Sequence, residues 1–482
     1  MTLNDTPRGN RTHIGIFGRR NAGKSSLINA LTGQKLAIVS QTPGTTADPV
    51  FKSMELHPVG PVVFIDTAGF DDEGELGELR VAKTAETIKQ TDVAVLVLDG
   101  PELAGCARLE YIDEMPENRR ESIPSGIPVL SGLLALEQQW MEKLQAAKIP
   151  AIVVVNKWDQ INEAGRRAVR EMVQEFTDQQ AEDDAPIPVS AKTGEGIDAL
   201  RSAITAAVPE EILNTQMTAG LIEDEGLALL VMPQNIQAPK GRLILPQVQT
   251  IRELLDRRCT VVSTTLDGLG RSLQSLDRSP DLIITDSQCF KEVYEKKPEQ
   301  SLLTSFSILM AASKGDIGTF VDGVSAIDDA AVDTDGAPAA DDAAAVDADG
   351  APAADADGAP AADAEAAKAA AGPFRVLIAE ACTHVPQNED IGTVKIPRLL
   401  KQEFGDRVEI TNVRGKDFPE EDALKEYDLI IHCGACMFNR QMVMSRIAAA
   451  QRAGVPITNY GVFLAKMSGI LDKVSLPKGD SR

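Results

Sequence analysis

Thiol and imidazole side chains gather on two short segments near the carboxyl end of the chain. Residues 431–436 read IHCGAC, with two cysteines three positions apart, and residues 382–384 read CTH. The whole chain has only six cysteines and four histidines, so chance explains this concentration poorly. Cysteine and histidine are the ligands that zinc prefers, and cysteine thiolates also hold iron–sulfur clusters. The pattern predicts a soft-metal site with five candidate ligands: Cys382, Cys433, Cys436, His384 and His432.

The residue types alone leave the metal open. Zinc would take four closed ligands, for which Cys382, His384, Cys433 and Cys436 are available. Three cysteines with a weaker or missing fourth ligand suit instead a four-iron cluster with one accessible iron, and His384 or His432 is a candidate for that iron. The alternative to a metal site is that these cysteines are ordinary buried side chains. The isolated thiols are predicted to be small buried hydrophobic residues: Cys106, Cys259 and Cys289.

At the other end of the chain, a phosphate-binding motif stands between an apolar run and a helical pattern. Residues 18–25 read GRRNAGKS, which matches G-x4-G-K-S. Glycines let backbone amides wrap phosphates, Lys24 neutralises terminal phosphate charge, and the Ser25 hydroxyl suits Mg²⁺. The motif predicts these nucleotide contacts: Gly18, Asn21, Ala22, Gly23, Lys24, Ser25 and Ser26.

Three further motifs, DTAG, NKWD and SAK (residues 190–192), follow in the order expected of a GTPase. Residues 66–69 (DTAG) follow an apolar run; Asp66 is expected to hold Mg²⁺ through water, and the Gly69 amide to sense the terminal phosphate. Residues 156–159 (NKWD) also follow an apolar run. The Asp159 carboxylate can accept from two adjacent donors on guanine that adenine lacks. The set predicts GTP rather than ATP, with these base contacts: Asn156, Lys157, Asp159, Ser190, Ala191 and Lys192.

The first switch segment is predicted at residues 43–48 (PGTTAD), where Thr46 would be the second magnesium hydroxyl. Phe70 stands where Ras-like enzymes carry the glutamine that orients water. The motifs resemble the TrmE–Era–EngA class of GTPases, in which an asparagine at the place of Asn21 helps to bind K⁺. A loop-forming role is the alternative for Asn21. The residues expected to act on bound GTP are Lys24, Asn21, Thr46 and Gly69.

Charge and composition narrow the classes of partner. The formal net charge is −24, and residues 326–372 account for −11 of it, so the rest of the chain carries −13. An acidic chain repels a phosphate backbone, which disfavours nucleic acid. We find no apolar stretch long enough to span a membrane and no signal-peptide core, so we expect a cytoplasmic protein in a reducing compartment.

Pattern and composition divide the chain into four parts. Alternating strand and helix patterns predict an α/β fold with a parallel sheet in residues 1–208, interrupted by a surface insertion at about 100–133. Similar patterns predict α/β domains at 209–325 and 373–482. Residues 326–372 are almost entirely Ala, Asp, Gly and Pro, and predict a disordered linker. Both metal-type segments follow strand patterns, which predicts that they are neighbours at one edge of a sheet.

Nearly the whole chain resembles the iron-iron hydrogenase maturation GTPases of the HydF family. The resemblance rests on C-x-H followed by HCxxC, on residues 391–398 (IGTVKIPR), 437–440 (MFNR) and 454–462 (GVPITNYGV), and on 285–288 (TDSQ) and 303–307 (LTSFS). The insertion and the Ala/Asp linker depart from the family pattern. The resemblance implies a GTPase domain, a middle dimerisation domain and a domain with a 4Fe–4S cluster on the three cysteines.

The resemblance also implies what such a chain works with. Members are scaffolds that receive a diiron precursor and pass it to apo iron-iron hydrogenase, with the radical enzymes HydE and HydG upstream. GTP hydrolysis would tune partner exchange, and a homodimer is expected. The alternative function is a ribosome- or tRNA-associated GTPase with a structural zinc module, which would need a basic RNA-binding surface.

Overall fold

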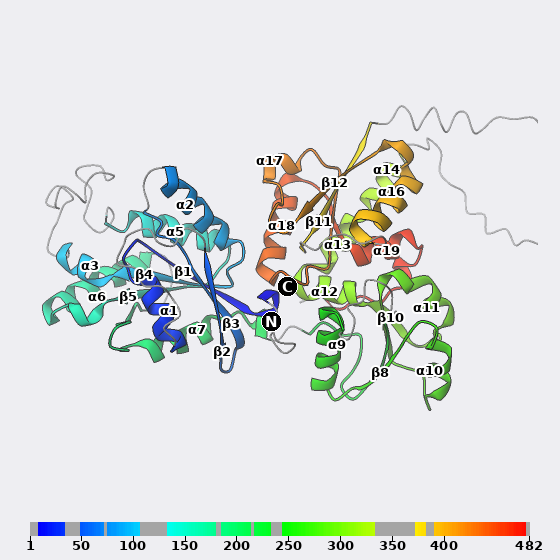
Figure 1. Ribbon diagram of the computed structural model, residues 1–482, viewed down its shortest axis with the longest axis horizontal. Helices are drawn as coiled ribbons and strands as arrows, with labels where there is room; N and C mark the ends of the chain where they lie inside the picture. Colours follow the sequence, from blue (N-terminus) through cyan, green and yellow to red (C-terminus); the bar gives the residue numbers. More distant parts are fainter. Residues whose placement is uncertain are drawn as a thin grey trace, which may run out of the picture. The chain divides into compact units, whose positions relative to one another are not determined.

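The chain folds into two compact units that hold three sheets (Figure 1). The computed structural model describes residues 8–33, 49–71, 75–106, 133–179, 185–213, 216–232, 243–332, 372–381 and 390–478. The first unit comprises Met1–Thr215 with Met437–Ser445, and the second comprises Gln216–Cys436 with Arg446–Arg482. Within the described ranges, no helix is long and apolar enough to cross a membrane.

The first unit is built on a six-stranded sheet with the order β2-β3-β1-β4-β5-β6. Its strands are β1 (Thr12–Gly18), β2 (Val50–Leu56), β3 (Gly60–Asp66), β4 (Val93–Asp99), β5 (Ala151–Asn156) and β6 (Ile187–Pro188). The pairs are parallel except that β2 runs antiparallel to β3. The expectation of a wholly parallel sheet is therefore corrected at this edge. The half-exposed, mixed-polarity β2 lacks the apolar run that marks the buried strands.

Helices cover both faces of this sheet, as predicted. Successive strand residues face opposite sides: Ala94 and Leu96 of β4 enter one buried cluster, whereas Val95 and Val97 enter another. Helices α3, α5 and α6 contribute to the first cluster, and α1 and α7 contribute to the second. The helices are α1 (Lys24–Thr32), α2 (Glu75–Ile88), α3 (Gly100–Cys106), α5 (Ala135–Ala146), α6 (Glu163–Gln179), α7 (Ile197–Ala207) and α8 (Glu210–Leu213), with short turns η1 (Arg8–Asn10) and η4 (Trp158–Gln160).

Both ends of the predicted surface insertion lie in the core. Its first residues form α3, in which Leu103 and Cys106 are buried in the core. Leu133, at its predicted end, is also buried. The prolines of this stretch masked a helix whose apolar side chains pack against β4 and α6. The remaining part, residues 107–132, lies outside the described residues.

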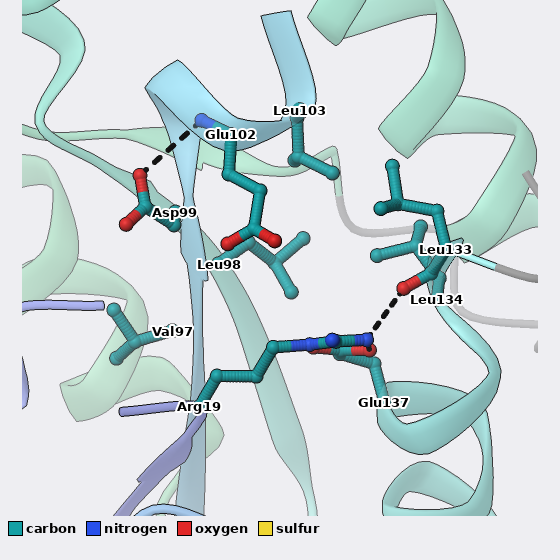
Figure 2. A pocket seen from close by; sticks show the side chains of 9 residues that line it. All are labelled: Arg19, Val97, Leu98, Asp99, Glu102, Leu103, Leu133, Leu134 and Glu137. Carbon is teal, nitrogen blue, oxygen red and sulfur yellow. Dashed lines mark hydrogen bonds and ion pairs between the residues drawn. The ribbon is translucent and has the colours of Figure 1, made fainter. Parts of the chain in front are cut away.

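An arginine ties the loop after β1 to helix α5. Figure 2 shows the guanidinium of Arg19 directly against the Glu137 carboxylate, at a small pocket lined also by Glu102 of α3. Its Nε and Nη2 donate to the two Glu137 carboxylate oxygens at 2.6 and 2.9 Å, and Nη2 donates to the Leu133 carbonyl at 2.6 Å. Burial lowers the pKa of Arg19, but the hydrogen bond and charge of Glu137 outweigh burial and raise it. The bidentate pair fixes the start of the phosphate loop against the core.

The second unit holds two parallel four-stranded sheets, in the orders β10-β9-β7-β8 and β12-β11-β13-β14. The strands are β7 (Leu227–Val231), β8 (Thr260–Thr264), β9 (Leu282–Thr285), β10 (Leu302–Ser305), β11 (Phe374–Glu380), β12 (Val408–Arg414), β13 (Leu429–His432) and β14 (Ile457–Asn459). The helices are α9 (Leu245–Asp256), α10 (Leu269–Ser275), α11 (Phe290–Lys296), α12 (Phe306–Lys314), α13 (Ile317–Gly323), α14 (Ala326–Val332), α16 (Ile396–Phe404), α17 (Glu421–Leu424), α18 (Arg440–Ala453) and α19 (Tyr460–Met467). Of α18, only the part from Arg446 belongs to this unit. Short turns are η5 (Ser287–Cys289), η6 (Ile391–Lys395), η7 (Gly405–Arg407) and η8 (Leu471–Lys473).

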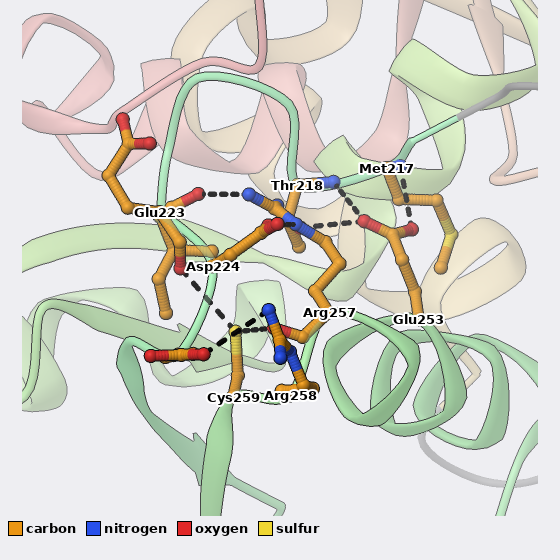
Figure 3. A network of polar contacts seen from close by, with 10 residues as sticks. Met217, Thr218, Glu223, Asp224, Glu253, Arg257, Arg258 and Cys259 are labelled. Carbon is orange, nitrogen blue, oxygen red and sulfur yellow. Dashed lines mark hydrogen bonds and ion pairs between the residues drawn. The ribbon is translucent and has the colours of Figure 1, made fainter.

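A polar network secures the segment that leads into β7 (Figure 3). Glu253 on α9 accepts from the amides of Met217 and Thr218 at 2.7 and 2.8 Å and from the Thr218 hydroxyl at 2.6 Å. Arg257 donates to Asp224 at 2.8 Å and to the Ile222 carbonyl at 2.6 Å. The beginning of the second unit is therefore fastened to α9 by two charged side chains.

The first residues of the predicted linker are helical. Residues 326–332 form α14, in which Ile327 is buried. Asp328 pairs with Lys466 at 2.6 Å, and the Ala330 carbonyl accepts from Arg407 at 3.1 Å. The composition of the linker resembles that of α14, so composition alone placed the boundary too early. The rest of the predicted linker, residues 333–371, lies outside the described residues.

Candidate functional site

The phosphate loop joins β1 to α1, and two of its glycines have positive φ angles. Gly18 has φ +150° and Gly23 has φ +90°. A Cβ atom on Gly18 would lie 2.4 Å from the Val97 carbonyl oxygen, and one on Gly23 would lie 2.3 Å from Nδ2 of Asn156. Only glycine fits both the conformation and the space at these two positions. The loop amides are thereby left to face a ligand.

Lys24, Ser25 and Asp66 converge at this loop. Lys24 Nζ donates to the carbonyls of Gly18 and Arg19 at 2.8 and 2.7 Å. Ser25 Oγ donates to Asp66 Oδ2 at 2.6 Å, and burial raises the pKa of Asp66. Within the described part of the chain, the buried Oδ1 of Asp66 has no hydrogen-bond partner. A hydroxyl beside a carboxylate with an unsatisfied oxygen is the donor set that suits Mg²⁺.

The predicted base-binding motifs meet at the other end of the site. Asn156 Nδ2 donates to the Ala22 carbonyl at 2.9 Å, and its Oδ1 accepts from the Ala191 amide at 3.2 Å. Ser190 Oγ donates to Asp159 Oδ1 at 2.7 Å. The amide side chain of Asn156 thus connects the phosphate loop to the segment 190–192, in which Lys192 is exposed.

Lys157 occupies a left-handed backbone position, with φ +60°, between Asn156 and Asp159. Its ammonium pairs with Asp99 at the end of β4 at 2.6 Å. Sequence reasoning did not find Asp99, although its place at a strand end of an α/β sheet is a signal for a site residue.

The side chain after Gly69 points into the core. Phe70 is 4% exposed and stacks on Trp140 of α5, with ring centroids 5.3 Å apart. The polar residue that meets the phosphate loop is instead Asp71, whose Oδ1 accepts from the Arg20 amide at 2.6 Å. The Phe70 side chain has no hydrogen-bonding group and therefore cannot orient water.

Asn21 lies exposed in the phosphate loop with φ +59°. Asparagine is among the few residues other than glycine that adopt this conformation readily. The conformation agrees with both predicted roles, as a loop former and as a K⁺ ligand. Thr46 and the first switch segment lie outside the described residues.

The two metal-type segments follow neighbouring strands, as the prediction of a shared sheet edge requires. Strands β11 and β13 pair in parallel with Ala379 opposite His432, and the Cys433 amide donates to the Ala379 carbonyl at 3.0 Å. Cys382 and His384 lie outside the described residues. However, Cys382 directly follows Ala381, which is described and contacts Cys433.

Cys433 is held as a hydrogen-bond acceptor. Its Sγ accepts from the amides of Ala381 at 3.0 Å and of Ala435 at 3.4 Å. Burial raises the pKa of Cys433 to about 11, and the two amides act in the opposite direction. Amide donors of this kind stabilise sulfur when it is a metal-bound thiolate. The donor set around Cys433 therefore fits a thiolate ligand.

Cys436 and the turn before it rest on the core of the middle region. Ala435 has φ +51°, a left-handed conformation that is costly for alanine, and Cys436 is half-buried against the cluster that contains Met310. Within the described residues, no group of three or more potential metal ligands is assembled. Two of the five predicted ligands are outside those residues. Cys106, Cys259 and Cys289 are buried, as predicted.

Both ring nitrogens of His432 contact other groups. Its Nδ1 lies 2.8 Å from the Cys433 carbonyl oxygen, and its Nε2 lies 3.0 Å from Nη1 of Arg446. Burial, followed by the charge of Arg446, lowers the pKa of His432 to about 3. A neutral ring that donates from Nδ1 and accepts at Nε2 satisfies both contacts.

Two residues that sequence reasoning missed hold the loop 433–436. Asn459 Nδ2 donates to the carbonyls of His432 and Cys433 at 3.3 and 3.2 Å, while its Oδ1 caps α19 by accepting from the Gly461 amide. Lys314, at the end of α12, donates to the carbonyls of Ala435 and Cys436. Asn459 lies in residues 454–462, which carry part of the family resemblance but showed no role in the site. The sequence signal at Lys314 is a single charged residue at the end of an apolar helix.

Protein-family models match three successive parts of the chain. The model described as "50S ribosome-binding GTPase" matches residues 13–157. The "Hydrogen maturase F dimerization domain" matches residues 217–315, and the "Hydrogen maturase F tetramerization domain" matches residues 365–477.

Curated relatives match part of the chain. GTPase Der of Nautilia profundicola is 30% identical over 195 residues, 40% of this chain and 35% of the relative. GTPase Era of Heliobacterium modesticaldum is 31% identical over 199 residues, 41% of this chain and 55% of the relative. The chain thus spans about a third to just over half of these relatives.

Solved structures are also similar to part of the chain. A complex of Era with MgGDPNP and nucleotides of 16S ribosomal RNA is 19% identical, with a TM-score of 0.32 over 53% of this chain and 93% of that one. The GTP-binding protein engB is 28% identical, with a TM-score of 0.30 over 41% of this chain and 100% of that one.

Proposed function

Because the chain belongs to the HydF-type hydrogenase maturases, we propose that it is a GTP-hydrolysing scaffold that carries a 4Fe–4S cluster and delivers a diiron precursor to apo iron-iron hydrogenase. The observation that carries this proposal is the pairing of β11 with β13, with the Ala381 amide on Cys433 Sγ. This contact brings Ala381, the residue that precedes Cys382 in the sequence, to the start of the loop 433–436.

The residues of the first unit support separate roles in binding the phosphates, the metal ion and the base of GTP. The phosphate-loop amides and Lys24 would bind the phosphates. Ser25 and Thr46 would hold Mg²⁺ directly and Asp66 would hold it through water, and the ion would neutralise charge on the phosphates. Asp159 selects guanine, and Ser190 orients the Asp159 carboxylate through the 2.7 Å hydrogen bond. Water attacks the terminal phosphorus, the bond to the bridging oxygen breaks, and GDP and phosphate leave.

K⁺ is proposed as a further activator of hydrolysis. Phe70 is buried against Trp140 and cannot orient water, and Asn21 lies in the loop where a cation ligand would stand. A monovalent cation there would offset charge that develops on the phosphates. Hydrolysis should be faster in K⁺ than in Na⁺ at matched ionic strength. Equal rates in the two salts would contradict this part of the proposal.

The cluster is proposed to be held by Cys382, Cys433 and Cys436, with His384 or His432 as weaker candidates for the remaining iron. A cluster bound in this way supplies an iron that can bind the incoming precursor. Cys433 fits best among the described residues because two amides already point at its sulfur. His432 is less suited because both ring nitrogens are engaged by Cys433 and Arg446.

The chain is proposed to work as a homodimer in the cytoplasm with HydE and HydG as upstream partners. The matching dimerization and tetramerization domains support assembly of several copies. We expect neither nucleic acid nor a membrane among the partners, as the net charge of −24 disfavours the first.

Anaerobic reconstitution of five alanine variants tests the cluster site. We expect Cys382→Ala, Cys433→Ala and Cys436→Ala each to lose the four-iron signal in electron paramagnetic resonance and in iron counting. His384→Ala and His432→Ala should keep most of it, because thiolates are the stronger iron ligands. A full signal in any cysteine variant would refute the assignment. Complete loss in a histidine variant would make that histidine an obligatory ligand.

A further inference from the structure

Helix α12 forms a platform for the loop 433–436. Ser305 caps its first turn by accepting from the Ile308 amide at 3.2 Å. A Cβ atom built on Gly434 would meet Ser307 Oγ at 3.8 Å and Met310 Cβ at 3.9 Å, so the turn passes along this helix. Ser307 Oγ also donates to Asn459 Oδ1 at 3.2 Å.

Lys314 ends this helix and turns toward the same loop. It is 7% exposed, and its Nζ donates to the Ala435 carbonyl at 3.2 Å and to the Cys436 carbonyl at 3.3 Å. Burying an ammonium group costs free energy. A lysine buried in this way therefore indicates that its hydrogen bonds, or a nearby negative charge, offset that cost. The two carbonyls belong to the strained residue and to the second thiol of the loop.

We propose that Lys314 is a positioning residue for the thiol-bearing loop, which it holds in shape and whose negative charge it offsets. This proposal rests on the proposed function and adds a residue from the middle region to the cluster site. By fixing the Ala435 carbonyl, Lys314 holds the left-handed turn that aims the Ala435 amide at Cys433 Sγ. Its ammonium also places one positive charge beside a site where thiolates and a cluster gather negative charge.

The two roles predict different losses. The positioning role depends on hydrogen bonds, so a side chain that still donates should partly preserve the loop. The electrostatic role depends on charge, because a nearby positive charge favours the reduced, more negative cluster. A lysine that only strengthens α12 would affect neither the loop amides nor the reduction potential.

Three substitutions separate these roles. Lys314→Met removes donor and charge, Lys314→Gln keeps a donor without charge, and Lys314→Arg keeps both. Lys297→Met is the matched control, because Lys297 also donates to backbone carbonyls of the middle region, at 2.8 to 3.1 Å, but on another loop. Circular dichroism and melting temperature establish that each full-length variant is folded.

The first measurement uses the protein without a cluster. Hydrogen–deuterium exchange at residues 433–436 should be about tenfold faster in Lys314→Met than in the unsubstituted chain, because the turn loses both contacts. Exchange should be intermediate in Lys314→Gln and close to that of the unsubstituted chain in Lys314→Arg and Lys297→Met. Unchanged exchange in Lys314→Met would overturn the positioning role, whether or not a cluster ever binds.

The second measurement uses the reconstituted protein. The midpoint potential of the cluster should move to more negative values in both Lys314→Met and Lys314→Gln, and should stay in place in Lys314→Arg and Lys297→Met. An unchanged potential in Lys314→Gln would overturn the electrostatic role. If the unsubstituted chain takes up no cluster, the proposed function fails, while the exchange measurement still decides whether Lys314 holds the loop. If Lys314→Met fails to fold, Lys314→Gln and Lys314→Arg decide both points.

Discussion

His432 shows how a histidine inside a metal-type motif can serve the backbone. Its ring lies between the Cys433 carbonyl and Arg446, and burial lowers the pKa of His432 to about 3. Arg446 in turn donates to the Gly415 carbonyl. The contacts hold the end of β13 in place, so the loop that follows starts from a rigid point.

Lys24 is the residue whose loss should separate the two proposed activities. We expect Lys24→Ala to abolish GTP hydrolysis, because the terminal phosphates lose their neutralising charge. Its iron content after reconstitution should stay close to that of the unsubstituted chain, since the phosphate loop and the thiols belong to different units. Phosphate release and iron counting measure the two properties. An equal loss of iron would show that the units are not independent.

Asp92 should make the stability of the first unit depend on pH. Burial raises the pKa of Asp92 from 3.8 to about 7, although the His13 amide donates to it at 2.7 Å and acts in the opposite direction. The folded state therefore retains a proton that the unfolded chain releases. The stability this provides is full below pH 4 and is lost as the pH rises through about 7.

Asp92→Asn should remove this dependence, because the side-chain amide never ionises. It keeps an acceptor for the His13 amide but loses the acceptor for Asn439 Nδ2. Between pH 5 and pH 8, the melting temperature of the unsubstituted chain should fall relative to that of the variant. The corresponding change in the difference between their free energies of unfolding should be a few kcal/mol. Calorimetry of the full chain measures this shift. Parallel pH profiles of the two proteins would exclude the effect.

At the scale of elements, the bidentate ion pair between Arg19 of the phosphate loop and Glu137 of α5 is expected to contribute most to the stability of the first unit. Glu137→Gln should destabilise that unit by about 2 kcal/mol, because it leaves the guanidinium of Arg19 with a weaker partner. The melting temperature should fall by about 5 °C. Glu86→Gln is the control, because its pair with Lys89 is exposed and surface pairs contribute about 0.5 kcal/mol. A fall no larger than that of the control would mean that this ion pair adds no stability.

The sequence predicted the elements that carry contiguous signals. The phosphate loop, DTAG and NKWD are each local motifs that follow apolar runs, and the structure confirms the strands before them. The edge strand β2 was missed because its residues are half exposed and mixed in polarity. Helices α3 and α14 were assigned to irregular segments because proline and Ala/Asp composition masked their few buried apolar side chains.

Contacts between distant residues could not be predicted in the same way. Lys314 and Ala435 are 121 residues apart, and no local pattern links a helix-ending lysine to a carbonyl in another sheet. The proximity of β11 and β13 was predictable because parallel strands place their carboxyl ends at one edge. Which side chains then hold the loop depends on packing that only the folded chain defines.

At the scale of the whole molecule, the middle and carboxyl-terminal sheets form one unit. The loop 433–436 follows β13 of the carboxyl-terminal sheet. Lys314 and Met310, which it contacts, belong to the middle region (residues 209–325). The cluster site is therefore expected to require both regions together, and a truncated carboxyl-terminal fragment would lack Lys314.

The Ala/Asp segment is the part of the chain that should be dispensable. We expect deletion of residues 333–371 to leave folding, GTP hydrolysis and cluster content unchanged, because its composition offers almost no large apolar side chain for packing. The deletion spares α14, whose Ile327 is buried. Circular dichroism, phosphate release and iron counting check the three properties. A cooperative loss of the whole fold would contradict the linker interpretation.

The most direct test of the scaffold proposal is the metal content of the full-length chain purified and reconstituted without oxygen. We predict a brown protein with about four iron and four sulfide per chain and a four-iron signal in electron paramagnetic resonance. Cys433→Ala, prepared in parallel, should lack all three. A colourless protein with about one zinc per chain and no sulfide would contradict the cluster proposal and favour a structural zinc module.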